Sequence, residues 1–123
     1  EKEARFSLGD QETGVRPLTS MLIKKSSCKN IILKLGSRGS MAANQKNFNN
    51  EIHTLDSFSD NAVDPVGSGD ALLAYSSLSL LHKDCIGTAS IIGSLAAAIE
   101  CEKNGNIPVT VDEVIKKIQE IKL

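Results

Sequence analysis

The spacing of apolar residues predicts a helix directly after a glycine-rich turn in the middle of the chain. The turn, residues 64–70, has the sequence Asp-Pro-Val-Gly-Ser-Gly-Asp. Pro65 favours extended backbone at Asp64, so a strand or loop should end just before the turn. The apolar positions that follow recur at helical spacing and predict one buried helix face over residues 71–83. These positions are Ala71, Ala74, Tyr75, Leu78 and Leu81.

Two further helices are predicted near the N-terminus. Residues 1–8 form a short helical segment that Gly9 ends. Pro17 suits the first turn of a second helix that runs to about Ser26. The apolar face of this second helix consists of Leu18, Met21 and Leu22.

Two more helices are predicted near the C-terminus. Residues 84–103 have little polar surface, so this helix should be buried on most sides, with Gly105 just past its end. Thr110 and Glu113 form a capping box that starts an amphipathic terminal helix. The apolar positions of the terminal helix are Val111, Val114, Ile115, Ile118 and Ile121.

The segment between the N-terminal pair of helices and the central helix predicts a small sheet. Residues 30–35 are nearly all apolar, and the short length of this run favours a buried parallel strand. The sequence Gly-Ser-Arg-Gly at 36–39 is typical of a tight hairpin turn that leads to a second strand over 40–43. The Asn-rich residues 44–50 predict a hairpin tip, and 51–58 contain a third strand.

Composition indicates a soluble α/β domain, or a piece of one, over residues 1–123. Hydrophobic residues make up 41% and charged residues 24%, which is typical of a globular chain. With three Phe, one Tyr and no Trp, the core must consist of Ile, Leu, Val and Ala. The net charge of −1 and the scattered basic residues exclude a general attraction to nucleic acid or to an acidic membrane. No signal peptide or membrane-length apolar run is present.

The cysteines and histidines show no metal-ligand pattern. Cys28, Cys85 and Cys101 are widely spaced and odd in number, which indicates reduced thiols in a cytoplasmic protein. His53 and His82 are not spaced as metal ligands of each other or of a cysteine. We therefore expect no disulfide framework and no zinc site.

The glycine-rich turn has the chemistry of an anion site. Gly67 and Gly69 allow backbone conformations that other residues avoid, and they place no side chain in front of a ligand. A helix that begins here directs free backbone N–H groups and its positive dipole end outward. Asp70 is either a helix cap or a base that accepts a proton from an attacking hydroxyl. From the residues alone, phosphate binding and a plain capped turn both remain open.

Residues 64–70 closely resemble the second signature of the ribokinase-like (PfkB) carbohydrate kinases. The resemblance implies a doubly wound, Rossmann-like layered α/β fold, of which this chain is the C-terminal portion. It also implies that the backbone amides of Gly67, Ser68 and Gly69 form an anion hole for the transferring phosphoryl group. Asp70 would be the catalytic base. The family usually has a small residue where Tyr75 stands, which concerns local packing.

The same resemblance assigns nucleotide-binding residues. In the family, a Leu-Gly-x-x-Gly segment lines the nucleotide, which places Lys34, Gly36, Ser37 and Gly39 beside ATP. The pattern alone also fits any hairpin turn. Farther along, the resemblance places Gly93, Ala97 and the loop 104–107 near the adenine, although core packing is the alternative for each.

An Asn-x-x-Glu motif of these kinases helps to organise Mg²⁺ through water. Glu3 falls where its Glu should be, and the alternative is a solvent-exposed helix carboxylate. Because residue 1 already lies inside a helix, we expect a piece cut from a longer kinase, with little activity alone. An uncovered sheet edge and apolar face favour self-association, or pairing with the missing N-terminal half.

The resemblance implies a carbohydrate kinase that transfers a phosphoryl group from ATP, with Mg²⁺, to a sugar or sugar-phosphate hydroxyl. The opening Glu-Lys-Glu-Ala-Arg and the Asp-Pro pair are most similar to the heptose-phosphate kinase branch. Two other hypotheses remain. A noncatalytic nucleotide- or phosphate-binding module would keep the anion site and have no use for Asp70. A purely structural α/β domain would use Gly-Ser-Gly only as a tight turn.

Overall fold

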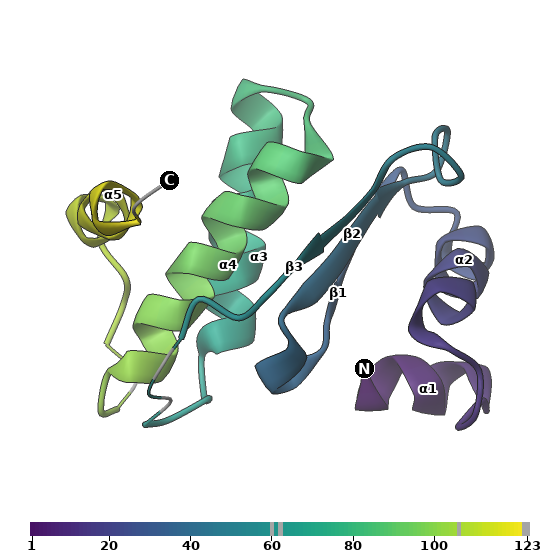
Figure 1. Cartoon of the computed structure of the whole chain (residues 1–123), viewed down its shortest axis with the longest axis horizontal. Coiled ribbons are helices and arrows are strands. Elements are labelled where there is room, and N and C mark those ends of the chain that lie inside the picture. Colours follow the sequence, from purple (N-terminus) through teal and green to yellow (C-terminus); the bar gives the residue numbers. More distant parts are fainter. Residues whose placement is uncertain (60, 62, 106, 122–123) are drawn as a thin grey trace. The chain divides into compact units, whose positions relative to one another are not determined.

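The computed structural model describes residues 1–59, 61, 63–105 and 107–121. The chain folds as two compact units, Glu1–Asp56 and Ser57–Leu123. Figure 1 labels their helices and strands. The first unit combines two helices with a sheet, and the described part of the second unit is helical. The α/β fold class predicted from the sequence is confirmed.

The first unit contains a three-stranded sheet in the order β1-β2-β3. Both pairs are antiparallel, with Ile32 opposite Ala42 and Ala42 opposite His53. The elements of this unit are α1 (Lys2–Leu8), α2 (Val15–Ser26), β1 (Asn30–Lys34), the 3₁₀ turn η1 (Gly36–Arg38), β2 (Ser40–Asn44) and β3 (Ile52–Leu55).

The prediction of a buried parallel strand over residues 30–35 is wrong for the described sheet. β1 pairs antiparallel with β2, and within β1 only Leu33 is buried. The physical reason is the length of the connection, because η1 spans only Gly36–Arg38. A parallel pair needs a crossover of about a dozen residues or more, whereas a short turn reverses the chain.

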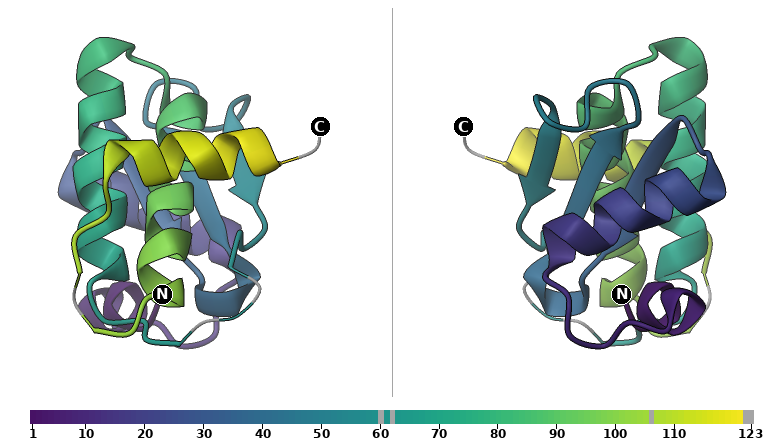
Figure 2. Two further views of the ribbon diagram at one scale, coloured as in Figure 1. Left: turned by 90° about the vertical axis from the view of Figure 1, so that its left-hand side faces the viewer. Right: turned by 90° about the vertical axis from the view of Figure 1, so that its right-hand side faces the viewer.

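Helix α2 packs on the sheet with a face that agrees only in part with the one predicted (Figure 2, right). Leu18, Thr19 and Ile23 are buried, whereas the predicted Met21 is exposed. Thr19 can be buried because its hydroxyl donates to the Val15 carbonyl at 2.8 Å. The helix was therefore predicted correctly, whereas its buried face is rotated about the helix axis from Met21 toward Thr19 and Ile23.

The second unit contains α3 (Ser68–His82), α4 (Ile86–Glu102) and α5 (Val111–Glu120). Helices α3 and α4 run antiparallel side by side (Figure 1). Helix α5 crosses them (Figure 2, left). Most residues of α4 are buried, which confirms the prediction of a helix covered on most sides. Among the described residues, no helix is both long and apolar enough to span a bilayer.

The predicted apolar face of α3 is correct only in part, since Ala71 and Tyr75 pack against the core but the predicted leucines do not. The buried residues are Ser68, Leu72 and Ser76, whereas Leu78 and Leu81 are 63% and 84% exposed. Ser76 is accommodated because its hydroxyl donates to the Leu72 carbonyl at 2.6 Å. Apolar residues occur all round this helix, so their spacing cannot determine which side is covered.

The predicted capping box of α5 is confirmed. The Glu113 carboxylate accepts from the Thr110 N–H at 2.7 Å, and the Glu113 N–H donates to the Thr110 hydroxyl at 3.3 Å. Lys103 adds an ion pair at 2.9 Å. These hydrogen bonds, first those of Thr110 and then that of Lys103, hold the pKa of Glu113 below its ordinary value.

Tyr75, the position at which the chain departs from the family pattern, ties α3 to the segment before α5. Its hydroxyl donates to the Val109 carbonyl at 2.8 Å. Its ring packs with Val109 against Ala96, Ile99 and Val114. The larger side chain is therefore used in packing.

The helix ends agree only in part with the sequence predictions. Gly9 ends α1 in the left-handed conformation, with φ 64°, as predicted. Helix α4 instead ends at Lys103 in extended backbone, and Gly105, with φ 88°, lies in the following loop. The predicted role of Gly105 as the residue just past the helix is therefore wrong.

We predict that Gly39→Ala destabilises the protein much more than Gly36→Ala. Gly39 has φ 83°, and a Cβ there would lie 1.9 Å from the Leu55 carbonyl oxygen. Gly36 has φ 64°, with no atom within 4 Å of a Cβ. Gly36→Ala should cost about 1–2 kcal/mol through backbone strain, and Gly39→Ala more than about 3 kcal/mol through strain plus the clash.

Urea unfolding of both variants beside the wild type measures this difference. Gly36→Ala is the matched control, because it introduces the same residue at positive φ in the same turn. Equal losses of stability in the two variants would show that the close approach of β3 to Gly39 does not determine the need for glycine.

Candidate phosphate-binding site

The glycine-rich turn is held by its own polar groups. The Asp64 carboxylate accepts from the Val66 N–H at 2.9 Å, which closes the turn around Pro65. The Ser68 hydroxyl donates to the Pro65 carbonyl at 2.8 Å. Gly67 then enters the left-handed region, with φ 85°, as the N-cap of α3. A residue with a side chain would be strained at that position.

The turn is also anchored to the end of α4. The Cys101 carbonyl accepts from the N–H groups of Val63 at 2.7 Å and Asp64 at 3.0 Å. Carbonyls in the last turn of a helix have no partner within the helix, and here the chain leading into the turn supplies one. The first turn of α3 is therefore placed by α4.

The first turn of α3 presents open backbone donors. The first hydrogen bond of the helix runs from the Ala71 N–H to the Gly67 carbonyl at 3.0 Å, and the Ser68 N–H bonds the Pro65 carbonyl at 3.3 Å. Within the described part of the chain, the N–H groups of Gly69 and Asp70 have no acceptor. They lie at the positive end of the α3 dipole, where an anion is favoured.

Asp70 stands beside these donors. It is the acidic residue in the first turn of α3, and its side chain is exposed. The structure therefore brings Gly67, Gly69 and Asp70 together at one helix end. Ser68, predicted as part of the same anion hole, has its side chain buried and its N–H engaged by Pro65. Sequence reasoning missed the closing role of Asp64, although an Asp two residues before a turn N–H is its known signal.

The predicted nucleotide residues of the first unit lie in and around η1. Gly36 and Ser37 are exposed, and Lys34 is half-buried at the end of β1. The turn is closed by the Leu35 N–H, which donates to the Gly39 carbonyl at 2.8 Å. The close contact of Gly39 with Leu55 gives that glycine a structural reason independent of any ligand.

The predicted residues of α4 are buried. A Cβ on Gly93 would lie 2.9 Å from the Leu72 carbonyl and 3.0 Å from the Ser76 Cβ. Gly93 is thus needed for the close approach of α4 to α3. Ala97 is also buried, at 8% exposure. Of the loop 104–107, residue 106 lies outside the described residues.

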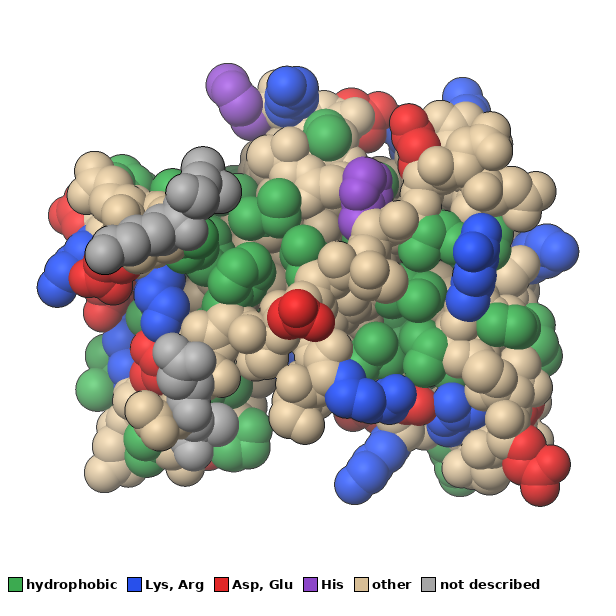
Figure 3. Space-filling model, in the orientation of Figure 1, with side chains coloured by type: hydrophobic (Ala, Val, Ile, Leu, Met, Phe, Trp, Pro, Cys, Tyr) green, Lys and Arg blue, Asp and Glu red, His purple; other side chains and the backbone are tan. Residues whose placement is uncertain are grey.

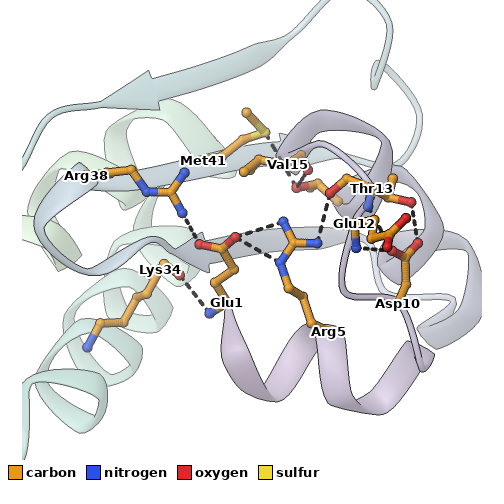
Figure 4. Close-up of polar contacts among 10 residues, drawn as sticks. Glu1, Arg5, Asp10, Glu12, Thr13, Val15, Lys34, Arg38 and Met41 are labelled. Carbon is orange, nitrogen blue, oxygen red and sulfur yellow. Dashed lines mark hydrogen bonds and ion pairs between the residues drawn. The ribbon is translucent and has the colours of Figure 1, made fainter.

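Glu3, predicted to hold Mg²⁺ through water, is exposed on α1. Its neighbour Glu1, which the sequence did not single out, makes the polar contacts instead (Figure 4). Its spacing to Arg5 was a usable signal, because residues four apart on a helix face each other. The described residues contain no cluster of three or more His, Cys, Asp or Glu that could hold a metal directly. Cys28, Cys85 and Cys101 are free thiols.

The chain is similar in sequence and in structure to known kinases. The family model described as pfkB family carbohydrate kinase matches residues 1–113. Ribokinase from Thermotoga maritima is similar in structure, with a TM-score of 0.78 and 27% identity over 98% of this chain and 39% of that chain. A comparison with functionally curated proteins found no match.

Two further solved structures show the same fold at lower identity. Phosphofructokinase-2 from Escherichia coli, in complex with potassium, has a TM-score of 0.83 and 16% identity over 97% of this chain and 38% of that chain. Ribokinase from Arabidopsis thaliana, complexed with ribose and ATP, has a TM-score of 0.78 and 21% identity over 97% and 39%. The chain thus spans less than half the length of the kinases it matches.

We predict that Gly93→Ala lowers stability although alanine is the better helix former. Helix propensity favours the change by about 1 kcal/mol. The added Cβ would contact the Leu72 backbone at 2.9 Å and force α3 and α4 apart. Overpacking of this kind costs about 1–3 kcal/mol, so after the gain in propensity we expect a net loss of up to about 2 kcal/mol in urea unfolding.

Ser77→Ala, at an exposed position of α3, is the control, because it gains propensity without a clash. A Gly93→Ala variant that is as stable as Ser77→Ala would contradict the packing role of Gly93.

Proposed function

The chain belongs to the PfkB family of carbohydrate kinases, and we propose that it supplies the phosphate-binding turn and the catalytic base of such a kinase. The reaction is phosphoryl transfer from ATP to a hydroxyl group of a sugar or sugar phosphate. One observation carries the proposal. The exposed carboxylate of Asp70 lies in the same helical turn as the open N–H groups of Gly69 and Asp70.

Each group in this turn has a defined task. Asp70 accepts the proton of the attacking sugar hydroxyl. The oxygen of that hydroxyl forms a bond to the γ-phosphorus of ATP, while the bond between this phosphorus and the ADP oxygen breaks. The backbone N–H groups of Gly69 and Asp70 donate to the phosphoryl oxygens, on which negative charge is concentrated. The positive end of α3 stabilises the same charge. Because the hydrogen bonds of Asp64 and Ser68 already hold the turn, these donors need no rearrangement.

ATP is a suitable phosphoryl donor for this chain, because the open backbone N–H groups at the N-terminus of α3 can bind phosphate oxygens. Mg²⁺ bound to its phosphates would neutralise charge there, and it needs few direct protein ligands. Glu3, which is exposed on α1, is the proposed water-mediated Mg²⁺ ligand on the basis of the family resemblance. Lys34, Gly36, Ser37 and Gly39 form the proposed nucleotide contacts of the first unit. Gly93 and Ala97 would contribute to the adenine site only through packing.

The acceptor is proposed to be a heptose phosphate. Support comes from the opening Glu-Lys-Glu-Ala-Arg and from the Asp64-Pro65 pair, both of which resemble that branch. In the structure Asp64 closes the turn before α3, so this pair shapes the proposed phosphate site. A panel of sugars and sugar phosphates is therefore the direct way to identify the acceptor. We also propose a cytoplasmic location, based on the three unpaired thiols.

We predict that Asp70→Asn, made in the full-length kinase, lowers kcat at least about 100-fold, because the amide cannot accept the proton. Binding of Mg·ATP, measured by calorimetry, should stay within about threefold, since the backbone donors are unchanged. Asp112→Asn is the matched control. It removes the same charge from the first turn of another helix, α5, and should leave both quantities unchanged.

An unchanged kcat in Asp70→Asn would refute the role as base. Mg·ATP binding without turnover in any variant or with any acceptor would instead favour the noncatalytic binding module. Failure of the wild type to bind Mg·ATP, with a folded circular dichroism spectrum, would favour the purely structural domain.

We also propose that the exposed apolar side of the second unit is an association surface, for a second copy or for the rest of a longer kinase. Leu73, Leu78 and Leu81 of α3 are 64%, 63% and 84% exposed. Figure 3 shows hydrophobic side chains at the surface over the α3–α4 pair. An uncovered apolar area of this kind is unfavourable in water.

We predict concentration-dependent self-association of the 123-residue chain in sedimentation velocity, reduced by Leu78→Lys. Met21→Lys, which places the same charge at an exposed apolar position of α2, is the control. A monodisperse wild-type monomer would contradict the proposed surface.

A further inference from the structure

The Glu1 carboxylate lies between two guanidinium groups (Figure 4). One oxygen, Oε1, accepts from Arg5 Nε at 2.9 Å and from Arg5 Nη2 at 2.8 Å. The other oxygen, Oε2, accepts from Arg38 Nη2. The hydrogen bonds of Arg5, and after them those of Arg38, hold the pKa of the Glu1 carboxyl below its ordinary value. Glu1 is therefore a charged bridge between helix α1 and the turn η1.

The Arg5 side of this bridge is fixed. Arg5 and Glu1 side chains are only 14% and 19% exposed. Arg5 Nη1 also donates to the Thr13 carbonyl at 2.8 Å. Thr13 is held in turn by Asp10, whose Oδ1 accepts from the Thr13 N–H at 2.9 Å. The Glu1 carboxylate is thus positioned from the α1 side, without help from Arg38.

The η1 side is the adjustable one. Arg38 is 60% exposed, and in the described part of the chain it pairs with Glu1. The N-terminal ammonium group of Glu1 also donates to the Lys34 carbonyl at 2.9 Å. Glu1 therefore holds the turn at two points, before it at Lys34 and inside it at Arg38. The Lys34 side chain points away from this cluster (Figure 4).

Among the described residues, few side chains hold the Gly36–Gly39 turn. Gly36 and Gly39 bring no side chains, Ser37 is exposed, and no side chain caps η1. Its internal bonds are between backbone groups: the Leu35 N–H donates to the Gly39 carbonyl at 2.8 Å, the Gly39 N–H to the Gly36 carbonyl at 3.0 Å and the Arg38 N–H to the Leu35 carbonyl at 3.3 Å. A glycine-containing turn of this kind loses much conformational entropy when it binds a ligand, unless something restricts it beforehand.

We propose that Glu1 is a positioning residue for nucleotide binding: through Arg38 and the Lys34 carbonyl it holds the Gly36–Gly39 turn rigidly against helix α1. The inference rests on the proposed function, in which this turn contacts ATP. Arg38 uses one of its five N–H donors on Glu1 and keeps others for solvent or an anion. The ion pair thus fixes the orientation of the Arg38 guanidinium group and occupies only part of its N–H donors.

The test compares Mg·ATP affinity in five proteins by calorimetry: wild type, Glu1→Gln, Arg38→Ala, the double variant and the control Glu12→Gln. A glutamine offers one acceptor oxygen, so it cannot serve both guanidinium groups. We expect Glu1→Gln and Arg38→Ala each to weaken binding about tenfold, the scale of coupling between groups in one network. The double variant should be no weaker than either single one. Glu12 is exposed, and Glu12→Gln should bind as the wild type does.

Hydrogen exchange provides a second readout that is independent of nucleotide. In Glu1→Gln the amides of Leu35 and Gly39 should exchange faster, while those of β2 and β3 stay unchanged. In steady-state kinetics the KM for ATP should rise in Glu1→Gln with kcat preserved. A general loss of structure would instead lower kcat and accelerate amide hydrogen exchange throughout the first unit.

The outcomes separate the inference from the proposed function. If the wild type does not bind Mg·ATP, the proposed function fails and the inference fails with it. If the wild type binds and Glu1→Gln binds equally well with unchanged exchange, only the inference fails. Additive losses in the double variant would also overturn it, because Glu1 would then not act through Arg38. If Glu1→Gln does not fold, Arg38→Ala decides, because it removes an exposed side chain.

Discussion

Most residues of helix α4 are buried, and its close packing places the neighbouring parts of the second unit. Its Gly93 lies so close to α3 that a Cβ would meet the Leu72 backbone, which sets both the separation and the rotation of α3. Ala96 and Ile99 on the same helix form the core against which Val114 of α5 packs. The Cys101 carbonyl holds the chain that enters the glycine-rich turn. A buried helix of small and aliphatic residues thus positions the proposed chemistry from behind.

Serine and threonine hydroxyls make this close packing feasible. Ser76 and Ser90 are buried in the helices of the second unit and donate to backbone carbonyls of their own helix. Thr19 does the same in α2. A small hydroxyl that bonds its own helix can be buried at little cost, and it leaves room for a neighbouring element. Such residues look polar in the sequence, yet they occupy interior positions.

The two proposed binding turns are held in different ways. The turn before α3 is closed locally, by Asp64 and Ser68 acting on residues two or three positions away. The η1 turn depends on a residue distant in the sequence, because Glu1, the first residue of the chain, forms an ion pair with Arg38. A locally closed turn keeps its shape wherever it occurs, whereas a turn held by a distant ion pair depends on the surrounding fold.

The sequence by itself determined the features that depend on neighbouring residues. These include the capping box of Thr110 and Glu113, the left-handed Gly9, and the glycine-rich turn with Asp70 at the start of α3. Local hydrogen bonds and backbone preferences act over a few residues, so a short stretch of sequence contains all of their partners.

Only the tertiary structure decided which sides of the helices are covered. The exposure of Leu78 and Leu81, the burial of Ser76 and Thr19, and the bridge from Glu1 to Arg38 all depend on segments far apart in the chain. The antiparallel pairing of β1 with β2 instead follows from the short turn at 36–39, which the sequence predicted as a hairpin turn. Apolar residues surround α3, so hydrophobic burial favours several rotations of that helix about equally. The contact at Gly93 selects one of them.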